Sequence, residues 1–261
     1  MSGTTRASRS PAGGIRFDAN LKWLFTEHPF ERRFDAAAAA GFAAVEYSSP
    51  YEHPPGRLRR ALDDSGLRQI LINTRQGAEG TPTRSGYACL PDRRGEFREA
   101  VLLGLEYATA LEASFLHVTA GAVPPGLPAD LALATYVSNI AWAAHEAEST
   151  PVRLLIEPQN PHDAPGYLLR TQGQAAAVVE AVGSDHLGIL LDLYHLQRTE
   201  GDLITAFDRH RERIAHVQIA DPPHRGEPGT GDEAHAGLHD RVADPGQPAE
   251  GGVEHRRRRH G

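Results

Sequence analysis

The stretch that decides the fold is VRLLIEPQN, residues 152–160. It begins with apolar, strand-forming residues around a single arginine and runs directly into Glu157. Pro158 follows, and because proline has no backbone N–H to donate, it closes the strand at that point. An ionised carboxylate at the end of a buried strand is costly unless a cation or a hydrogen-bond donor meets it. The sequence therefore predicts a partner for Glu157, either a metal ion or an Arg or His side chain.

Short strand-like runs alternate with helix-like runs on both sides of this stretch. The patterns predict strands over residues 15–21, 42–47, 67–74, 115–120, 152–156, 187–193 and 215–220, and helices over 34–40, 55–65, 93–111, 130–148, 171–182 and 201–213. Almost continuously apolar strands indicate a parallel sheet, and this many alternations in 261 residues favour an α/β fold of the TIM (β/α)8-barrel type. No G-x-G-x-x-G motif follows the first strand, so a dinucleotide-binding sheet loses its main support.

The composition, with 40% hydrophobic and 23% charged residues, is that of an ordinary globular protein. No apolar run is long enough for a membrane span and residues 1–14 have no signal-peptide core, so we expect a cytoplasmic protein with a disordered N-terminal tail and no membrane partner. The single cysteine, Cys89, excludes an internal disulfide and a cysteine-based zinc site. A net charge of −7 gives no reason to expect nucleic acid as a partner, and a homo-oligomer is left open.

A polar residue stands near the carboxyl end of each predicted strand, where TIM barrels place their active sites. These residues are Asn20, Glu46, Asn73, His117, Glu157, Asp192 and Gln218. Each one alone is most simply a hydrogen-bonded group near a strand end, but the whole set at one edge indicates a site. Glu157, Asp192 and Gln218 come from three consecutive strands, and their oxygens suit a hard divalent ion such as Mg²⁺ or Mn²⁺.

These motifs together resemble the hydroxypyruvate isomerase family of xylose-isomerase-like TIM barrels. The resemblance covers about residues 15–232, the predicted barrel domain, and rests on FDANLKWLF (17–25), VEYSSPY (45–51), LHVTAG (116–121), LLIEPQN (154–160), DLYHLQ (192–197), HVQIAD (216–221) and EPGTG (227–231). It implies a metal-assisted isomerase of a small hydroxy-keto acid, which interconverts hydroxypyruvate and tartronate semialdehyde through an enediolate. A 2-oxo-tetronate isomerase or a ketose epimerase of the same superfamily is the near alternative.

The resemblance also implies roles for individual residues. Glu157, Asp192 and Gln218 would be metal ligands, and Glu157 would in addition move protons. His195 and Arg225 match positions that hold substrate oxygens in the superfamily. The remaining strand-end residues, Asn20, Glu46, Asn73 and His117, are expected to contact the substrate.

The last residues, 233–261, depart from the family pattern. They contain no apolar run, scattered Gly and Pro, and a run of arginines, so the sequence predicts an irregular segment and an eighth βα unit that is missing or degraded. In the family this unit supplies a glutamate that is the fourth ligand and second acid/base. Glu254 stands at about the right spacing, but Gly251 and Gly252 before it are poor strand formers. A shifted reading frame near Asp232 is one explanation, and its test is whether another frame of the gene encodes the missing helix and strand.

Two other classes of function compete with the active isomerase. One is a catalytically impaired, truncated or frameshifted metal-binding barrel, since the same fold hosts many activities. The other is an apurinic-site endonuclease of the same superfamily, which would need more His and carboxylate ligands and a basic mouth. The strand-eight carboxylate is the feature that separates the active enzyme from the impaired barrel.

Overall fold

The computed structural model describes residues 16–231 and 250–253. The predicted tail over residues 1–14 and most of the predicted irregular segment over 233–261 lie outside them. The strands are β1 (Arg16–Asn20), β2 (Ala44–Glu46), β3 (Arg68–Gln69), β4 (Leu71–Asn73), β5 (Phe115–His117), β6 (Arg153–Ile156), β7 (Leu187–Asp192), β8 (Ile214–Ile219) and β9 (Glu250–Val253).

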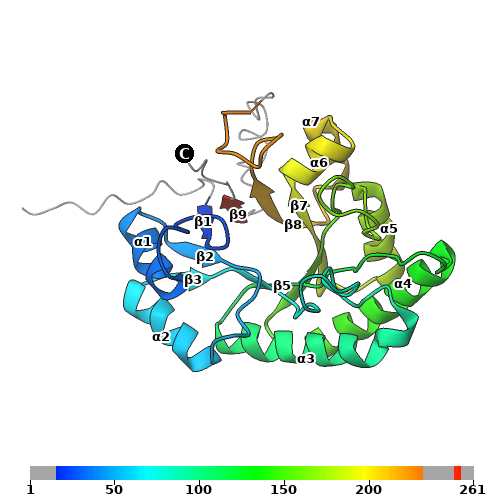
Figure 1. Ribbon diagram of the computed structural model, residues 1–261, viewed down its shortest axis with the longest axis horizontal. Coiled ribbons are helices and arrows are strands. Elements are labelled where there is room, and N and C mark those ends of the chain that lie inside the picture. The colour runs from blue at the N-terminus through cyan, green and yellow to red at the C-terminus, as the bar shows by residue number, and fades with distance from the viewer. Residues whose placement is uncertain (1–15, 232–249, 254–261) are drawn as a thin grey trace, which may run out of the picture.

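These strands form one parallel sheet in the order β3-β2-β1-β9-β8-β7-β6-β5-β4. The two ends of this order, β3 and β4, are consecutive parts of one strand that is interrupted at Ile70. The Ile70 N–H donates to the Val45 carbonyl at 2.9 Å, and the Ile70 carbonyl accepts from the Phe115 N–H at 2.9 Å. The ends of the order therefore meet, and the sheet closes into the parallel barrel that the sequence predicts (Figure 1).

A short strand stands where the eighth barrel strand belongs. β9 lies between β1 and β8 and pairs in parallel with both. The sequence predicts a missing or degraded eighth unit, and the described part of that unit is a strand of only four residues that includes Gly251 and Gly252. Main-chain hydrogen bonds need no side chain, so glycines suffice to pair two strand edges that would otherwise stay open. Glu254 lies outside the described residues.

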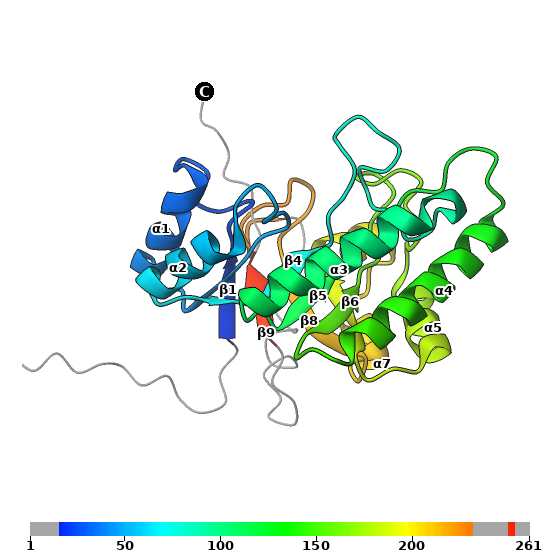
Figure 2. The ribbon, with the colours of Figure 1, turned by 90° about the horizontal axis from the view of Figure 1, so that it is seen from below.

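Helices cover the outside of the barrel, with α3 and α4 running side by side (Figure 2). They are α1 (Arg33–Ala39), α2 (Pro55–Ser65), α3 (Arg94–Ala110), α4 (Ala129–Ala147), α5 (Gln172–Val182), α6 (Leu193–Thr199) and α7 (Leu203–His210), with 3-10 turns η1 (Phe30–Arg32) and η2 (Pro91–Arg93). Local signals set several ends: α2 stops at Gly66, which has a φ of 68°, and α5 starts at the Thr171 capping box with Gln174.

The helix α6 was not predicted from the sequence. Asp192, the last residue of β7, is also its N-cap, and the Asp192 carboxylate accepts the N–H groups of Tyr194 at 2.9 Å and His195 at 3.4 Å. The chain thus turns from strand into helix without a loop. This turn fixes Tyr194 and His195 close to the carboxyl end of β7.

Buried apolar side chains form two groups. The larger group packs the helices onto the barrel and contains Phe34, Phe97 and Tyr136. The smaller group consists of Ala44, Ile70, Leu71, Leu155 and Leu190, packed against Phe115 and Ala215. Leu71 and Leu190 also line the central cavity, so the smaller group lies inside the barrel below it. None of the helices in residues 16–231 is both long and apolar enough to cross a membrane.

Close glycine packing anchors the long loop between β4 and η2. A Cβ atom on Gly86 would lie 2.5 Å from the Thr119 carbonyl oxygen, and the φ of Gly86 is 113°. A Cβ on Gly121, at φ 94°, would lie 2.9 Å from the Gly86 carbonyl oxygen. Only residues without a Cβ allow this approach, and it holds the loop against the chain that follows β5.

We expect Gly86→Ala to destabilise the protein by about 2–4 kcal/mol, because positive-φ strain and a backbone clash add. Gly80→Ala is the matched control: Gly80 has a φ of 80°, but no atom lies within 4 Å of its Cβ position. The control should cost only about 1 kcal/mol. Urea unfolding measures both values, and equal losses would contradict the packing argument.

Candidate active site

A cavity of about 900 Å³ opens at the carboxyl ends of the barrel strands. Its walls include the predicted residues Asn20, Asn73, His117, Glu157, His195, Gln218 and Arg225. The anchored loop contributes Gln76, Glu79, Arg84 and Ser85. A closed parallel barrel brings strand ends together in this way, which is why residues far apart in the sequence share one cavity.

Glu157 lies directly after β6, and its side chain is 5% exposed. Its Oε2 accepts a hydrogen bond from Gln159 Nε2 at 2.9 Å and lies 3.6 Å from His117 Nε2. Its Oε1 lies 3.8 Å from His195 Nε2. The carboxylate therefore has two imidazoles near it, which are among the predicted kinds of partner, and an amide that was not predicted.

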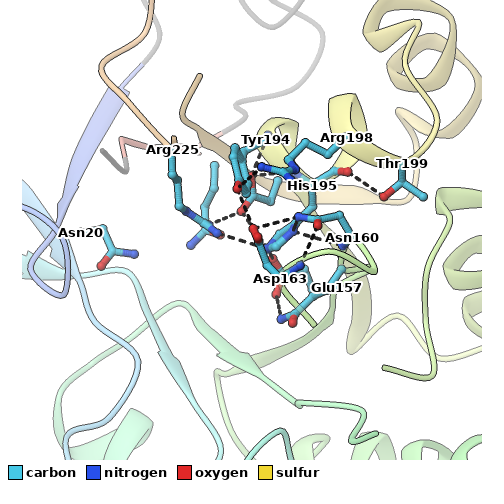
Figure 3. Close-up of polar contacts among 12 residues, drawn as sticks. Asn20, Glu157, Asn160, Asp163, Tyr194, His195, Arg198, Thr199 and Arg225 are labelled. Carbon is cyan, nitrogen blue, oxygen red and sulfur yellow. Dashed lines mark hydrogen bonds and ion pairs between the residues drawn. The ribbon is translucent and has the colours of Figure 1, made fainter. Parts of the chain in front are cut away.

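Asp192 is held from two sides. One carboxylate oxygen caps α6, and the other, Oδ2, pairs with the Arg225 guanidinium and lies 3.6 Å from His195 Nε2. Arg225 also packs near two aromatic rings: its guanidinium carbon lies 4.9 Å from the ring centre of Tyr194 (both labelled in Figure 3) and 5.4 Å from that of Trp23. Stacking of this kind orients a guanidinium while its edge stays available to anions.

Glu46, which was expected to contact the substrate, is instead fully buried behind the cavity wall. Its Oε1 accepts hydrogen bonds from Asn20 Nδ2 and Gln218 Nε2, both at 2.7 Å. Its Oε2 lies 2.9 Å from His216 Nε2. Because the Gln218 amide nitrogen is turned toward Glu46, its carbonyl oxygen is the end left for the cavity.

Two groups of acidic and histidine side chains have a geometry that could hold a metal ion. In the first, Glu157, Asp192 and His195 offer ligand atoms that all lie within 4.8 Å of one another. The second contains Asp18 with Glu46 and His216, and here the Glu46 oxygens already accept the hydrogen bonds described above. Glu157 and His195 of the first group line the cavity, and the two buried carboxylates of the group, Glu157 and Asp192, fit a hard divalent cation.

Sequence reasoning missed a polar network beside His195 (Figure 3). Asp163 Oδ2 accepts from Asn160 Nδ2 at 3.1 Å and from the Tyr194 hydroxyl at 2.6 Å. Arg198 Nη1 donates to the Tyr194 oxygen at 2.9 Å. Tyr194 and Arg198 lie on the helix that begins after Asp192, and a helical pattern of apolar residues would have been the signal for them. The helix has only seven residues, too few for such a pattern to be recognised in the sequence.

Burial keeps two histidines of the cavity neutral. Desolvation and the nearby His195 lower the pKa of His117 to about 3. Desolvation also lowers the pKa of His195 to about 4, although Asp192 acts in the opposite direction. The buried His117 Nε2 has no hydrogen-bond partner within the described part of the chain. A neutral ring nitrogen in this position can bind an oxygen of a ligand.

We expect the free energy of unfolding to fall as the pH drops below about 6.5. Between that pH and about 3, the pKa of His117 in the folded protein, His117 is protonated in the unfolded chain but stays neutral in the folded protein. The contribution of His117 to the free energy of unfolding is therefore full above about pH 6.5. As the pH falls from there toward about 3, it decreases by about 1.4 kcal/mol per pH unit. Urea unfolding of the wild type and His117→Gln from about pH 7 to about pH 5 measures the two slopes. The wild-type slope should be steeper by about one proton, and identical slopes would refute the assignment.

Comparison with known proteins gives consistent matches over most of the chain. The model of the xylose isomerase-like TIM barrel family matches residues 34–258. The 2-oxo-tetronate isomerase of Cupriavidus necator is 42% identical over 217 residues, which cover 83% of each chain. The hydroxypyruvate isomerase of Escherichia coli is 40% identical over 218 residues, 84% of each chain. The 2-oxo-tetronate isomerase of Haemophilus influenzae is 34% identical and covers 93% of this chain and 94% of its own.

Solved structures are also similar over most of this chain. A structure described as an AP endonuclease of family 2 from Brucella melitensis has a TM-score of 0.89 and 34% identity, and the match covers 94% of both chains. A 3-keto-D-glucoside 4-epimerase from E. coli has a TM-score of 0.79 at 19% identity, covering 95% of this chain and 94% of its own. The second match is evidence of the shared fold alone.

Proposed function

Because this chain belongs to the xylose isomerase-like TIM barrel family and is an isomerase of it, we propose that it moves a carbonyl group between adjacent carbons of a small hydroxy-keto acid. The proposed substrate is hydroxypyruvate, with tartronate semialdehyde as the product. Relatives named for hydroxypyruvate and for 2-oxo-tetronate both support this substrate class.

The observation that carries the proposal is the position of Glu157 beside two histidine side chains. One carboxylate at the cavity wall lies 3.6 Å and 3.8 Å from two imidazole nitrogens, those of His117 and His195. A carboxylate can remove a proton from a carbon next to a carbonyl and return it to the neighbouring carbon, through an enediolate. Neutral imidazoles beside it can hold the substrate oxygens on which charge develops. These three groups supply the parts that the isomerisation needs.

The residues fit a divalent metal ion, and Mg²⁺ or Mn²⁺ suits the oxygen ligands best. Glu157, Asp192 and the carbonyl oxygen of Gln218 would hold it; the contact between Gln218 and Glu46 described above leaves that oxygen for the cavity. When bound, such an ion supplies a Lewis acid that polarises a carbonyl. Glu254 is proposed as a fourth ligand and second acid/base.

Arg225 would select substrates that carry a carboxylate. Its guanidinium is fixed by the two aromatic rings and by Asp192, and a planar fork matches a carboxylate in two parallel hydrogen bonds. A neutral sugar lacks this group. The stacked arginine therefore favours a hydroxy-keto acid over a ketose as the substrate.

The test is a turnover assay with purified protein and added Mn²⁺ or Mg²⁺, using hydroxypyruvate, a 2-oxo-tetronate and a neutral ketose in parallel. We expect metal-dependent turnover of the acids and, because the Arg225 pairing is lost, a kcat/KM for the ketose lower by about 10²-fold or more. A higher kcat/KM for the four-carbon acid would show that the protein is a 2-oxo-tetronate isomerase and not a hydroxypyruvate isomerase. A folded, metal-binding protein that turns over none of them would identify the impaired barrel.

A further inference from the structure

Asn160, the last residue of the VRLLIEPQN stretch, contacts the Nδ1 side of the His195 ring (Figure 3). The Asn160 backbone N–H donates to His195 Nδ1 at 3.2 Å, and the Asn160 side-chain nitrogen Nδ2 lies 2.7 Å from the same atom. A backbone N–H can only donate. A proton on Nδ1 would point at this donor, so the contact favours a lone pair on Nδ1 of the neutral imidazole.

The orientation of the Asn160 amide is fixed by its own contacts. Its Oδ1 accepts the backbone N–H groups of His162 and Asp163, both at 3.0 Å, and its Nδ2 donates to Asp163 Oδ2 at 3.1 Å. Turning the amide over would set N–H groups against two backbone donors and an oxygen against a carboxylate. Nδ2 is thus a second donor facing His195 Nδ1.

The other ring nitrogen has different surroundings. His195 Nε2 lies 3.6 Å from Asp192 Oδ2 and 3.8 Å from Glu157 Oε1, and both of these atoms can accept. Arg225 Nη1, a donor, lies 3.3 Å away. Two donors at 2.7 Å and 3.2 Å on Nδ1 outweigh this single, longer approach, and so the proton belongs on Nε2.

We propose that His195 presents an Nε2–H group to the cavity, and that Asn160 is the positioning residue that sets this tautomer. The catalytic consequence rests on the function proposed above: His195 donates a hydrogen bond to a substrate oxygen beside Glu157. A nitrogen that carries a proton has no lone pair for a cation. His195 is then not a metal ligand, although its position near two carboxylates would allow one, and the third protein oxygen comes from Gln218.

The tautomer can be read directly by NMR of protein labelled with ¹⁵N-histidine at neutral pH, with His195→Asn to identify the signals. In long-range ¹H–¹⁵N spectra, Nε2 couples strongly to both carbon-bound ring protons, and Nδ1 to one of them. We expect the protonated nitrogen of His195 to be the one coupled to both. A proton on Nδ1 would overturn the inference.

Two variants test the role of Asn160. Asn160→Asp places a charged acceptor close to Nδ1, where Nδ2 now donates at 2.7 Å. This acceptor outweighs the backbone N–H at 3.2 Å, so the proton should move to Nδ1 and kcat should fall by ~10²-fold, with a smaller change in KM. Asp163→Asn is the matched control for the tautomer, because Asp163 contacts Asn160 without contacting His195 Nδ1. It should leave the Nε2–H signal in place. An unchanged tautomer in Asn160→Asp would overturn the positioning role.

The spectra need no substrate, and this separates the inference from the proposed function. If the Nε2–H signal is found and no acid is turned over, the proposed function fails and the tautomer stands. If acids are turned over and the proton lies on Nδ1, the inference alone fails.

Discussion

Replacing Glu157 by Gln should lower kcat by about 10²–10⁴-fold, because the amide has the size of the carboxylate but cannot take a proton from carbon. The fold should survive, since Gln can still accept the hydrogen bond from Gln159 Nε2. The measurement is steady-state turnover of hydroxypyruvate with added metal, beside the thermal stability of each protein.

The matched control is Glu112→Gln, which makes the same change on an exposed carboxylate that pairs with Arg59. It should leave kcat within a factor of about two, as expected of a surface ion pair. If Glu157→Gln keeps wild-type kcat while folded, the base is another group and the proposed role of Glu157 is wrong.

The second large effect is expected on stability. Gln218→Glu sets a second carboxylate 2.7 Å from the fully buried Glu46, in place of the amide that now donates to it. Two like charges cannot both ionise at that distance, and an unpaired buried charge costs roughly 3–5 kcal/mol. We expect a loss of about that size in the free energy of unfolding measured with urea.

A swapped pair is the sharpest check of this contact. In the double variant Glu46→Gln and Gln218→Glu, the amide and the carboxylate exchange places across this contact, and one donor again faces one acceptor there, while Asn20 Nδ2 loses its acceptor. The two changes should then couple favourably by about 1–3 kcal/mol relative to the sum of the single losses. Strict additivity would show that Glu46 and Gln218 do not form the hydrogen bond seen here.

The barrel and the gathering of its strand ends could be predicted because they follow from local patterns. Apolar runs that stop at a polar residue indicate where a buried strand ends, and parallel strands bring these ends to one edge. Asn20, His117, Glu157 and Gln218 were found in this way, and all four line the cavity. The rule does not say whether a strand-end side chain reaches the cavity, which is why Glu46 was misplaced.

What the sequence could not provide are contacts that exist only in three dimensions. Asn160 contacts a ring 35 residues further along the chain, and no spacing rule links the two. The helix α6 has seven residues, fewer than a helical period needs to become visible. The strand β9 contradicts the propensity of its two glycines, because open edges on β1 and β8 offer main-chain partners whatever the side chains are.

The central claim is that Glu157 moves a proton between two carbons of the substrate. The most direct measurement is NMR of the reaction in D₂O, which follows where solvent deuterium enters the product and the remaining substrate. The account predicts carbon-bound deuterium in the product of the wild type, and none above background in Glu157→Gln. Turnover and deuterium uptake in Glu157→Gln equal to those of the wild type would contradict it, because another group would then move the proton.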